Sequence, residues 1–220
     1  MWGGLTGFGC MTLDLLTTGP ADAGVRFLCA HGAGAGMDSP FLKTMAALLA
    51  ERGVATYRFE FVYMAARRHG TRKPPPRAER LMDEYRAAVA ALPAGAPLLI
   101  GGKSMGGRVA SLVADALHAE QRIAGLVCLG YPFHPPKRPE QLRTAHLEHL
   151  GCPALIVQGE RDPFGGRSEV EGYRLSPAIR LHWVGDGDHD LGPRGGSGFT
   201  RKGNLAAAAD AIAAFAATAG

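Results

Sequence analysis

Short apolar runs alternate with amphipathic helical segments along most of the chain, and this alternation limits the fold more than any other feature. Each run is rich in strand-favouring residues, and each is followed by apolar residues at helical spacing. We expect strands at 25–30, 54–61, 97–102, 123–131, 153–159 and 179–184. We expect helices at 40–53, 77–92, 105–117, 140–150, 168–173 and 204–219. Strands this apolar, separated by helices, predict an α/β protein with a mostly parallel central sheet and helices on both faces.

The bulk properties are those of a single globular domain. The chain has 220 residues, of which 46% are hydrophobic and 20% are charged, so it can form one substantial core. No apolar run approaches the roughly 18–20 residues of a membrane span. Residues 1–10 contain no Lys or Arg and no long apolar region, and they therefore make a poor signal peptide. We expect residues 1–10 to be an N-terminal extension before Met11, and residues 11–220 to form one domain.

The cysteines indicate a reduced protein. They stand at positions 10, 29, 128 and 152 and form neither a C-x-x-C pair nor a Cys/His metal spacing. Cys29 and Cys128 lie inside apolar runs, where a cysteine acts as a small buried hydrophobic residue. We therefore expect a cytoplasmic location.

The segment from Ile100 to Arg108, IGGKSMGGR, fits two opposed motifs. A phosphate-binding P-loop needs a glycine five residues before Gly102, and Pro97 stands there instead. A Gly-x-Ser-x-Gly nucleophile elbow needs a strand before it, a helix after it, and small residues two positions either side of the serine. The sequence around Ser104 provides all three. Ser104 is therefore the predicted nucleophile, and the Met105 N–H at the helix start is a predicted oxyanion donor. Lys103 is expected to be a solvated or rim side chain.

A serine nucleophile needs a base and an acid that orients it, and in this strand order the acid and then the histidine follow the serine. His189 lies after the last expected strand and before the last helix, so it is the predicted base. Asp162 lies just beyond the strand at 153–159 and is the predicted acid, with Glu160 as the competing choice. The other histidines have plainer roles: surface positions for 69, 118, 146 and 149, a strand position for 182, a pocket wall for 134, and shaping of the site for 31.

The glycine-rich stretch HGAGAG, residues 31–36, follows the first strong strand. As a dinucleotide fingerprint it is poor, because Ser39 occupies the place of the third glycine. As a turn beside the elbow it can present a second oxyanion N–H, from Ala33 or Gly34. No metal or organic cofactor is expected. The acids around His189 resemble the start of a calcium loop, but Leu191 replaces its turn glycine and Ser197 its bidentate glutamate.

Six basic residues and one acid, Glu79, lie between positions 67 and 80, although the whole chain has a net charge of only +4. A solvated, proline-stiffened loop explains this segment, and an anion-attracting rim beside a binding site is the alternative. Nucleic-acid binding is not expected, because no aromatic residues are interleaved with the charges and no recognition motif accompanies them.

The stretches AHGAGAGMDSPFL, YRFEF, RKPPPR, GGKSMGGR, QGERDPFG and GDHDL resemble the α/β-hydrolase superfamily. More narrowly, they resemble small bacterial hydrolase-like proteins related to testis-expressed protein thirty and to the hydrolase-like subunit of the non-specific lethal acetyltransferase complex. The resemblance covers nearly all of the chain after Met11 and implies the α/β-hydrolase fold and the triad positions. Some members are better regarded as scaffolds than as enzymes. About 20 residues separate Tyr131 from Pro153, too few for a large lid, and residues 130–136, GYPFHPP, are expected in the wall of an open site.

Two functions follow. The first is a serine hydrolase that cleaves carboxylic ester or thioester bonds of a small substrate through Ser104, His189 and Asp162. The second is a catalytically silent hydrolase-fold binding or scaffold protein, for which the pocket would be blocked and a stable protein partner would exist. No nucleic-acid or membrane partner is expected, and the chain is expected to be a monomer or a homodimer.

Overall fold

The computed structural model describes residues 13–218 and contains one seven-stranded sheet with the order β1-β3-β2-β4-β5-β6-β7. The strands are β1 (Leu16–Thr18), β2 (Val25–Ala30), β3 (Val54–Phe59), β4 (Leu98–Lys103), β5 (Gly125–Leu129), β6 (Ala154–Gly159) and β7 (Ile179–Val184). The helices are α1 (Pro40–Ala50), α2 (Val62–Arg68), α3 (Met82–Ala91), α4 (Met105–Ala119), α5 (Arg167–Val170) and α6 (Arg201–Ala216), with 3-10 turns η1 (Ala78–Leu81) and η2 (Ala145–Glu148). β1 is antiparallel to β3, and all other neighbouring pairs are parallel.

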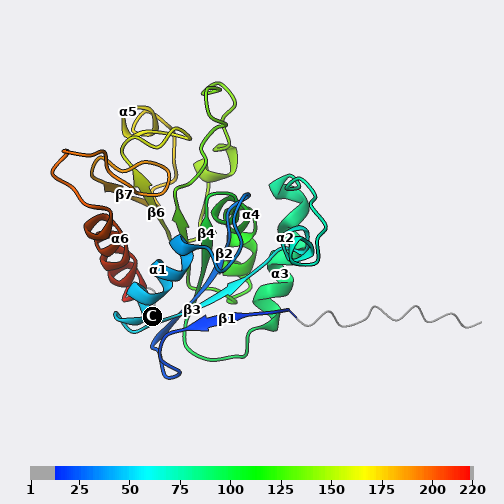
Figure 1. The fold of residues 1–220 in the computed structure, drawn as a ribbon. Coiled ribbons are helices and arrows are strands. Elements are labelled where there is room, and N and C mark those ends of the chain that lie inside the picture. The colour runs from blue at the N-terminus through cyan, green and yellow to red at the C-terminus, as the bar shows by residue number, and fades with distance from the viewer. Residues whose placement is uncertain (1–12, 219–220) are drawn as a thin grey trace, which may run out of the picture.

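Helices cover both faces of the sheet, as the apolar strands predicted. Figure 1 shows α1 and α6 together on one side, and α3 and α4 on the other. Side chains of α1 and α6 form one buried cluster with one face of the strands, and side chains of α3 and α4 form a second cluster with the opposite face. Every residue of β4, β5 and β6 is buried. The predicted α/β architecture is therefore confirmed.

Two elements were not predicted from the sequence. β1 has only three residues, two of them exposed, and it is too short to show the alternation of apolar and polar residues that is typical of a strand. α2 was expected to be part of the basic loop. No side chain at its own start caps this helix; instead Glu84 of α3 accepts the Val62 N–H at 2.7 Å. The cap comes from 22 positions further along the chain, so no local start signal exists.

The segment between β5 and β6 is short and mostly irregular. A helix was expected at 140–150, whereas the structure has only the four-residue turn η2. The Arg143 N–H donates to the Phe133 carbonyl at 2.7 Å, ten residues earlier, so the backbone before η2 folds back on residue 133 instead of forming a helix. No lid covers this end of the described domain, as predicted.

None of the helices within residues 13–218 is long and apolar enough to cross a membrane. Cys29, Cys128 and Cys152 are buried free thiols, and burial raises the pKa of Cys29 to about 12. The predicted extension at 1–10, including Cys10, lies outside the described residues.

The sheet places three predicted site residues at one edge. Ser104 follows β4, Asp162 lies beyond β6, and His189 lies beyond β7. Because parallel strands end at the same edge of a sheet, these loops meet although they are far apart in sequence.

Candidate active site

Ser104 is the single residue between β4 and α4, and its backbone is strained. Its φ is 51° and its ψ is −115°, a conformation that non-glycine residues rarely adopt. The Ser104 N–H donates to the Leu129 carbonyl of β5 at 2.9 Å, and the Ser104 carbonyl accepts the Arg108 N–H at 3.0 Å. These bonds hold the turn sharply, as a nucleophile elbow requires. No loop separates strand from helix, so a P-loop has no place here.

The glycines two residues before and after Ser104 are required by packing. A Cβ on Gly102 would stand 2.4 Å from the Ala30 carbonyl oxygen. A Cβ on Gly106 would stand 2.6 Å from the carbonyl oxygens of both Ala30 and His31. Both contacts are with backbone, which has no flexible end that can move aside. The predicted need for small residues here is confirmed.

Gly106→Ala is expected to lower the free energy of unfolding by about 3 kcal/mol, because α4 would have to move off β2. For a domain of this size that lowers Tm by about 6–12 °C. Alanine normally stabilises a helix relative to glycine, so a decrease in the free energy of unfolding would itself point to the close packing of α4 on β2. Thermal unfolding followed by circular dichroism measures it. Gly24→Ala is the control, since a Cβ there meets nothing within 4 Å; equal Tm values for the two variants would contradict the argument.

His189 and Asp162 are hydrogen-bonded to each other. The His189 Nδ1 lies 2.8 Å from the Asp162 Oδ2, and the Asp162 side chain is fully buried. Because the carboxylate only accepts, Nδ1 carries the proton in the neutral ring and Nε2 is left as the basic nitrogen. The Phe164 ring lies against the imidazole, with 4.3 Å between ring centroids. This arrangement fixes both the tautomer and the orientation of the ring.

Two further donors hold the Asp162 carboxylate. Gln158 Nε2 donates to Oδ2 at 3.0 Å, and the Phe164 N–H donates to Oδ1 at 2.9 Å. Gln158 is fully buried at the end of β6, and its amide also binds both the N–H and the carbonyl of Tyr131. Sequence analysis missed Gln158. The available signal was a lone polar residue in the apolar run ALIVQG.

Glu160, the competing acid, does not reach His189. Its carboxylate accepts the Asp186 N–H at 2.9 Å and pairs with Arg167 at 3.0 Å. The structure therefore brings Asp162, and not Glu160, to the histidine.

The 31–36 loop is held by its first residue. His31 is completely buried, and its Nε2 accepts the Phe61 N–H at 3.2 Å while Nδ1 lies 2.6 Å from the Gly32 carbonyl oxygen. Burial lowers the pKa of His31, which keeps the ring neutral and suited to these two bonds. The Tyr63 hydroxyl donates to the Ala33 carbonyl at 3.0 Å. His31 thus shapes the loop, as the sequence suggested.

Three backbone N–H groups are available beside Ser104. Ala33 and Gly34 donate to no protein acceptor within the described residues. Met105 is the first residue of α4, and the first N–H groups of a helix have no partner within it. A Cβ on Gly32 would be 3.8 Å from the Ser104 Cβ, so the loop lies directly against the elbow.

A cavity of about 500 Å³ lies against Ser104 and the 31–36 loop. Its lining includes Ser104 and His189, the loop residues 32–35, Ser39 to Leu42, and Lys103, Phe164, Asp190 and Arg201. Phe41, Leu42 and Phe164 make its walls mainly apolar, and the cavity is of the size that binds small organic molecules. Among the described residues no hydrogen bond joins the Ser104 hydroxyl to His189, and in unliganded enzymes such bonds are often long.

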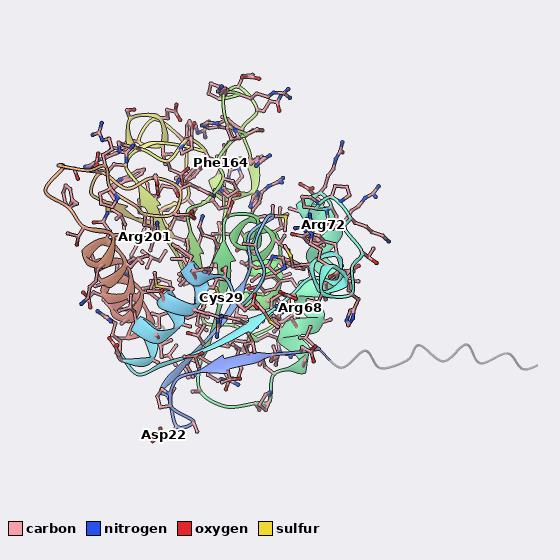
Figure 2. All side chains as sticks on the ribbon, in the orientation of Figure 1. Asp22, Cys29, Arg68, Arg72, Phe164 and Arg201 are labelled. Atoms are coloured by element: carbon pink, nitrogen blue, oxygen red, sulfur yellow. The ribbon has the colours of Figure 1, made fainter. Side chains whose placement is uncertain are left out.

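Two expectations about the surroundings are wrong, and the alternative of a basic rim at residues 67–80 is not supported. Residues 130–136 do not line the cavity, and Tyr131 and Phe133 are fully buried. None of residues 67–80 lines it either, and Arg68 pairs with Glu60 at 2.7 Å. Figure 2 shows Arg68 and Arg72 on the α2 side of the molecule, well away from Phe164 and Arg201. Lys103 was expected in solvent, but its side chain is buried and faces the cavity.

The remaining histidines lie outside the cavity lining. His134 was expected in the pocket wall but is buried and bonded to Glu169 at 2.9 Å. His146 is partly buried, not a surface residue, because its Nε2 lies 2.8 Å from the Ser111 hydroxyl of α4. His182 lies in β7, as expected.

No group of three or more potential metal-binding His, Cys, Asp or Glu side chains occurs within residues 13–218. The acids flanking His189 have partners of their own. Asp186 pairs with Arg161 and Arg194, and the Asp188 carboxylate accepts the N–H groups of Asp190 and Gly192. These acids therefore stabilise the loop itself.

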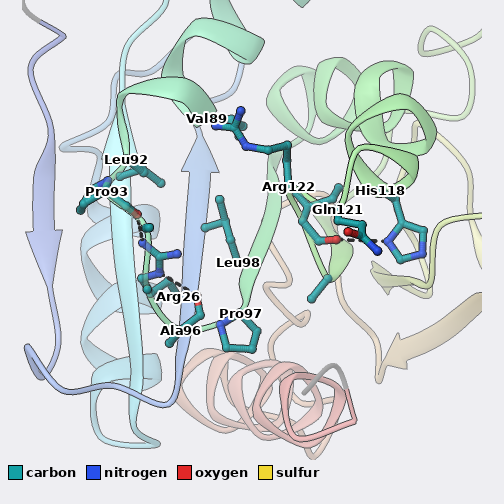
Figure 3. A pocket seen from close by; sticks show the side chains of 14 residues that line it. Arg26, Val89, Leu92, Pro93, Ala96, Pro97, Leu98, His118, Gln121 and Arg122 are labelled. Carbon is teal, nitrogen blue, oxygen red and sulfur yellow. Dashed lines mark hydrogen bonds between the residues drawn. The ribbon is translucent and has the colours of Figure 1, made fainter.

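A second hollow of about 580 Å³ lies at the opposite edge of the sheet (Figure 3). It is lined by residues 92–98, the end of α4 and Arg26. Arg26 donates to the carbonyls of Pro93 and Ala96 and so ties the loop before β4 to the start of β2. The lining of this hollow contains neither a nucleophile nor an acid–base pair, so its residues have a structural role.

The geometry agrees with known folds. Residues 23–217 match the family described as the alpha/beta hydrolase domain. Solved structures are similar at low identity. An alpha-beta serine hydrolase homologue from Coxiella burnetii is 19% identical, with 81% of this chain and 84% of that one covered and a TM-score of 0.65. A serine hydrolase without a lid from Xanthomonas campestris is 20% identical, with 81% of each chain covered and a TM-score of 0.62.

Dienelactone hydrolase from Anabaena variabilis is also 20% identical, with 94% of this chain and 92% of that one covered and a TM-score of 0.66. At these identities the similarity concerns the fold. The family match extends over nearly the whole described domain. The chain belongs to the alpha/beta hydrolase family.

Proposed function

We propose that this protein is a serine hydrolase that cleaves carboxylic ester or thioester bonds of a small substrate. One observation carries the proposal: a buried Asp162 holds the His189 imidazole at 2.8 Å, and both His189 and the strained Ser104 line one cavity. An acid, an oriented base and an exposed serine are the three components that activate a serine hydroxyl.

The proposed reaction uses these groups in sequence. Ser104 Oγ attacks the substrate carbonyl carbon while His189 Nε2 takes the hydroxyl proton. The tetrahedral oxyanion is bound by the N–H of Met105 with that of Ala33 or Gly34. His189 then returns the proton to the leaving alcohol or thiol, and a water attacks the acyl–serine in the same way, which releases the acid and free Ser104. Asp162 keeps the imidazole oriented and stabilises its charged form.

The cavity favours short acyl groups. Its volume of about 500 Å³ is modest, its walls are apolar, and no lid extends it over a long chain. The motifs quoted above also support a closer kinship with the testis-expressed protein thirty and non-specific lethal complex proteins, some of which are scaffolds. Among the described residues the Ser104 hydroxyl makes no hydrogen bond to His189, and this observation favours the second function, a silent binding protein.

A fluorophosphonate probe separates the two functions. We expect the wild-type protein to form a covalent adduct on Ser104, located by peptide mass spectrometry, and Ser104→Ala to form none. Ser39→Ala is the matched control, because Ser39 also lines the cavity but its hydroxyl caps α1. A folded wild-type protein that stays unlabelled, or that is labelled no better than Ser104→Ala, would overturn the hydrolase proposal and favour the scaffold.

A further inference from the structure

Lys103 is a buried lysine for which the proposed reaction has no use. It is the last residue of β4, directly before Ser104, and only 7% of it is exposed. Its ammonium lies 3.3 Å from the carboxylate of Asp190 and 5.5 Å from the centre of the Phe41 ring. A charge removed from water is costly unless it is paired, so this ion pair needs an explanation.

Asp190 directly follows His189, so the ion pair joins the two loops that carry the proposed nucleophile and base. The sheet does not join them. In the strand order, β5 and β6 stand between β4 and β7. With about 4.8 Å between neighbouring strands, the ends of β4 and β7 are roughly 14 Å apart, and the His189 loop must lean back over β5 to reach Ser104.

Gly130, at the end of β5, leaves room for this approach. Its φ is +64°, and a Cβ there would stand 2.9 Å from the His189 carbonyl oxygen. The same Cβ would be 3.3 Å from both the His189 Nδ1 and the Lys103 Nζ. The lysine and the histidine therefore both lie directly beside this glycine.

The side-chain contacts of His189 and Asp190 lead to the ends of different strands. The Asp162 bond ties the imidazole to the loop after β6, whereas the Asp190 pair ties the backbone beside it to β4. We propose that Lys103 and Asp190 are a positioning pair, which holds the His189 loop against the Ser104 elbow at a distance suited to proton transfer. This inference rests on the proposed function.

The charged groups around the pair are few. Asp162, Asp188 and Asp190 oppose the effect of burial on the Lys103 ammonium, since burial lowers its pKa and these carboxylates raise it. Arg201 is the other cation in the cavity lining. Lys103→Met therefore removes a positive charge near the imidazole, and Asp190→Asn removes a negative one. The two substitutions must therefore shift the acidic limb of the kcat/KM profile against pH in opposite directions.

The test compares Asp190→Asn, Lys103→Met, the double variant and Asp190→Glu in p-nitrophenyl acetate hydrolysis. Displacing a reacting group by about 1 Å costs about 10²-fold in rate. We expect each single variant to lower kcat by about 10- to 100-fold with little change in KM, and Asp190→Glu to recover most of it. The double variant is expected to be no worse than the poorer single one, because the pair acts as a unit. Lys103→Met moves the acidic limb of the kcat/KM profile to higher pH, and Asp190→Asn moves it to lower pH.

A second readout does not depend on turnover. Hydrogen exchange of the peptide covering 186–192 is expected to speed up in Asp190→Asn and Lys103→Met, while peptides of β4 and β5 are unchanged. Glu120→Gln is the control, since it removes the carboxylate of another partly exposed ion pair, with Arg86, at the far end of α4.

The outcomes are distinct. If the variants exchange faster as expected but the wild-type protein neither hydrolyses the ester nor reacts with fluorophosphonate, the hydrolase proposal is overturned. The role of the pair in holding the His189 loop is then still supported. An active wild type whose Asp190→Asn variant matches it in kcat and in exchange overturns the positioning pair. If Lys103→Met raises KM alone and Asp190→Asn changes nothing, Lys103 contacts substrate instead, and the proposal is also overturned.

Discussion

Ser104→Ala is expected to lower kcat for p-nitrophenyl acetate by about 10⁴–10⁶-fold, which is the scale of losing the nucleophile of a serine enzyme. The reason is chemical rather than structural. The methyl group keeps the turn but supplies no oxygen for the acyl intermediate, so only the oxyanion donors and substrate binding remain. Initial rates of the two proteins, measured at equal protein concentration, give the loss of kcat.

Folding is checked in the same preparation, because a collapsed elbow would also abolish activity. Tm is expected to stay within a few degrees of wild type, since the Ser104 hydroxyl makes no hydrogen bond to any of the described residues. A folded Ser104→Ala protein that keeps more than a few per cent of kcat would show that another group performs the reaction.

Asp162→Asn is expected to lower kcat by about 10⁴-fold, the effect of the same exchange in a serine protease triad. Oδ2 accepts from two donors, His189 Nδ1 and Gln158 Nε2, and Oδ1 accepts the Phe164 N–H. An amide must place its NH₂ against at least one of these donors in either orientation. If the NH₂ faces His189, the imidazole is driven to the wrong tautomer, and Nε2 then carries the proton and cannot act as a base.

Glu160→Gln is the matched control, since Glu160 is two residues away and pairs with Arg167 instead. We expect its kcat to stay within about threefold of wild type, as is usual when a mostly exposed ion pair is removed. Equal losses in the two variants would mean that general disturbance of this loop, and not the Asp162–His189 bond, controls the rate. Kinetics at the pH optimum and Tm for each protein decide between these outcomes.

The regular elements were predictable where local pattern decides them. The runs that became β2, β4, β5 and β6 are largely buried, so each is mainly apolar and stands out in the sequence. The elbow was predictable for a similar reason. A strand, a serine between small residues and a helix form one continuous stretch, and the Ala30 and His31 carbonyls show why only glycine fits at 106.

Elements that depend on distant partners were not predictable. The start of α2 is capped by Glu84, and β1 exists only by pairing with β3. Tyr131 and Phe133 looked like cavity walls, because a residue after a strand is expected at the site edge. Both are buried instead, and the Gln158 side chain of the neighbouring strand holds the Tyr131 backbone in place.

The sequence by itself determined the α/β architecture and the order of serine, acid and histidine along the chain, because both depend on spacing within short segments. Only the tertiary structure decided which acid reaches His189, which side chains form the cavity, and that Lys103 is buried against Asp190. The physical reason is the strand order. It brings loops that are 27 to 87 residues apart in the sequence to one edge of the sheet, and no local pattern records which side chains then face each other.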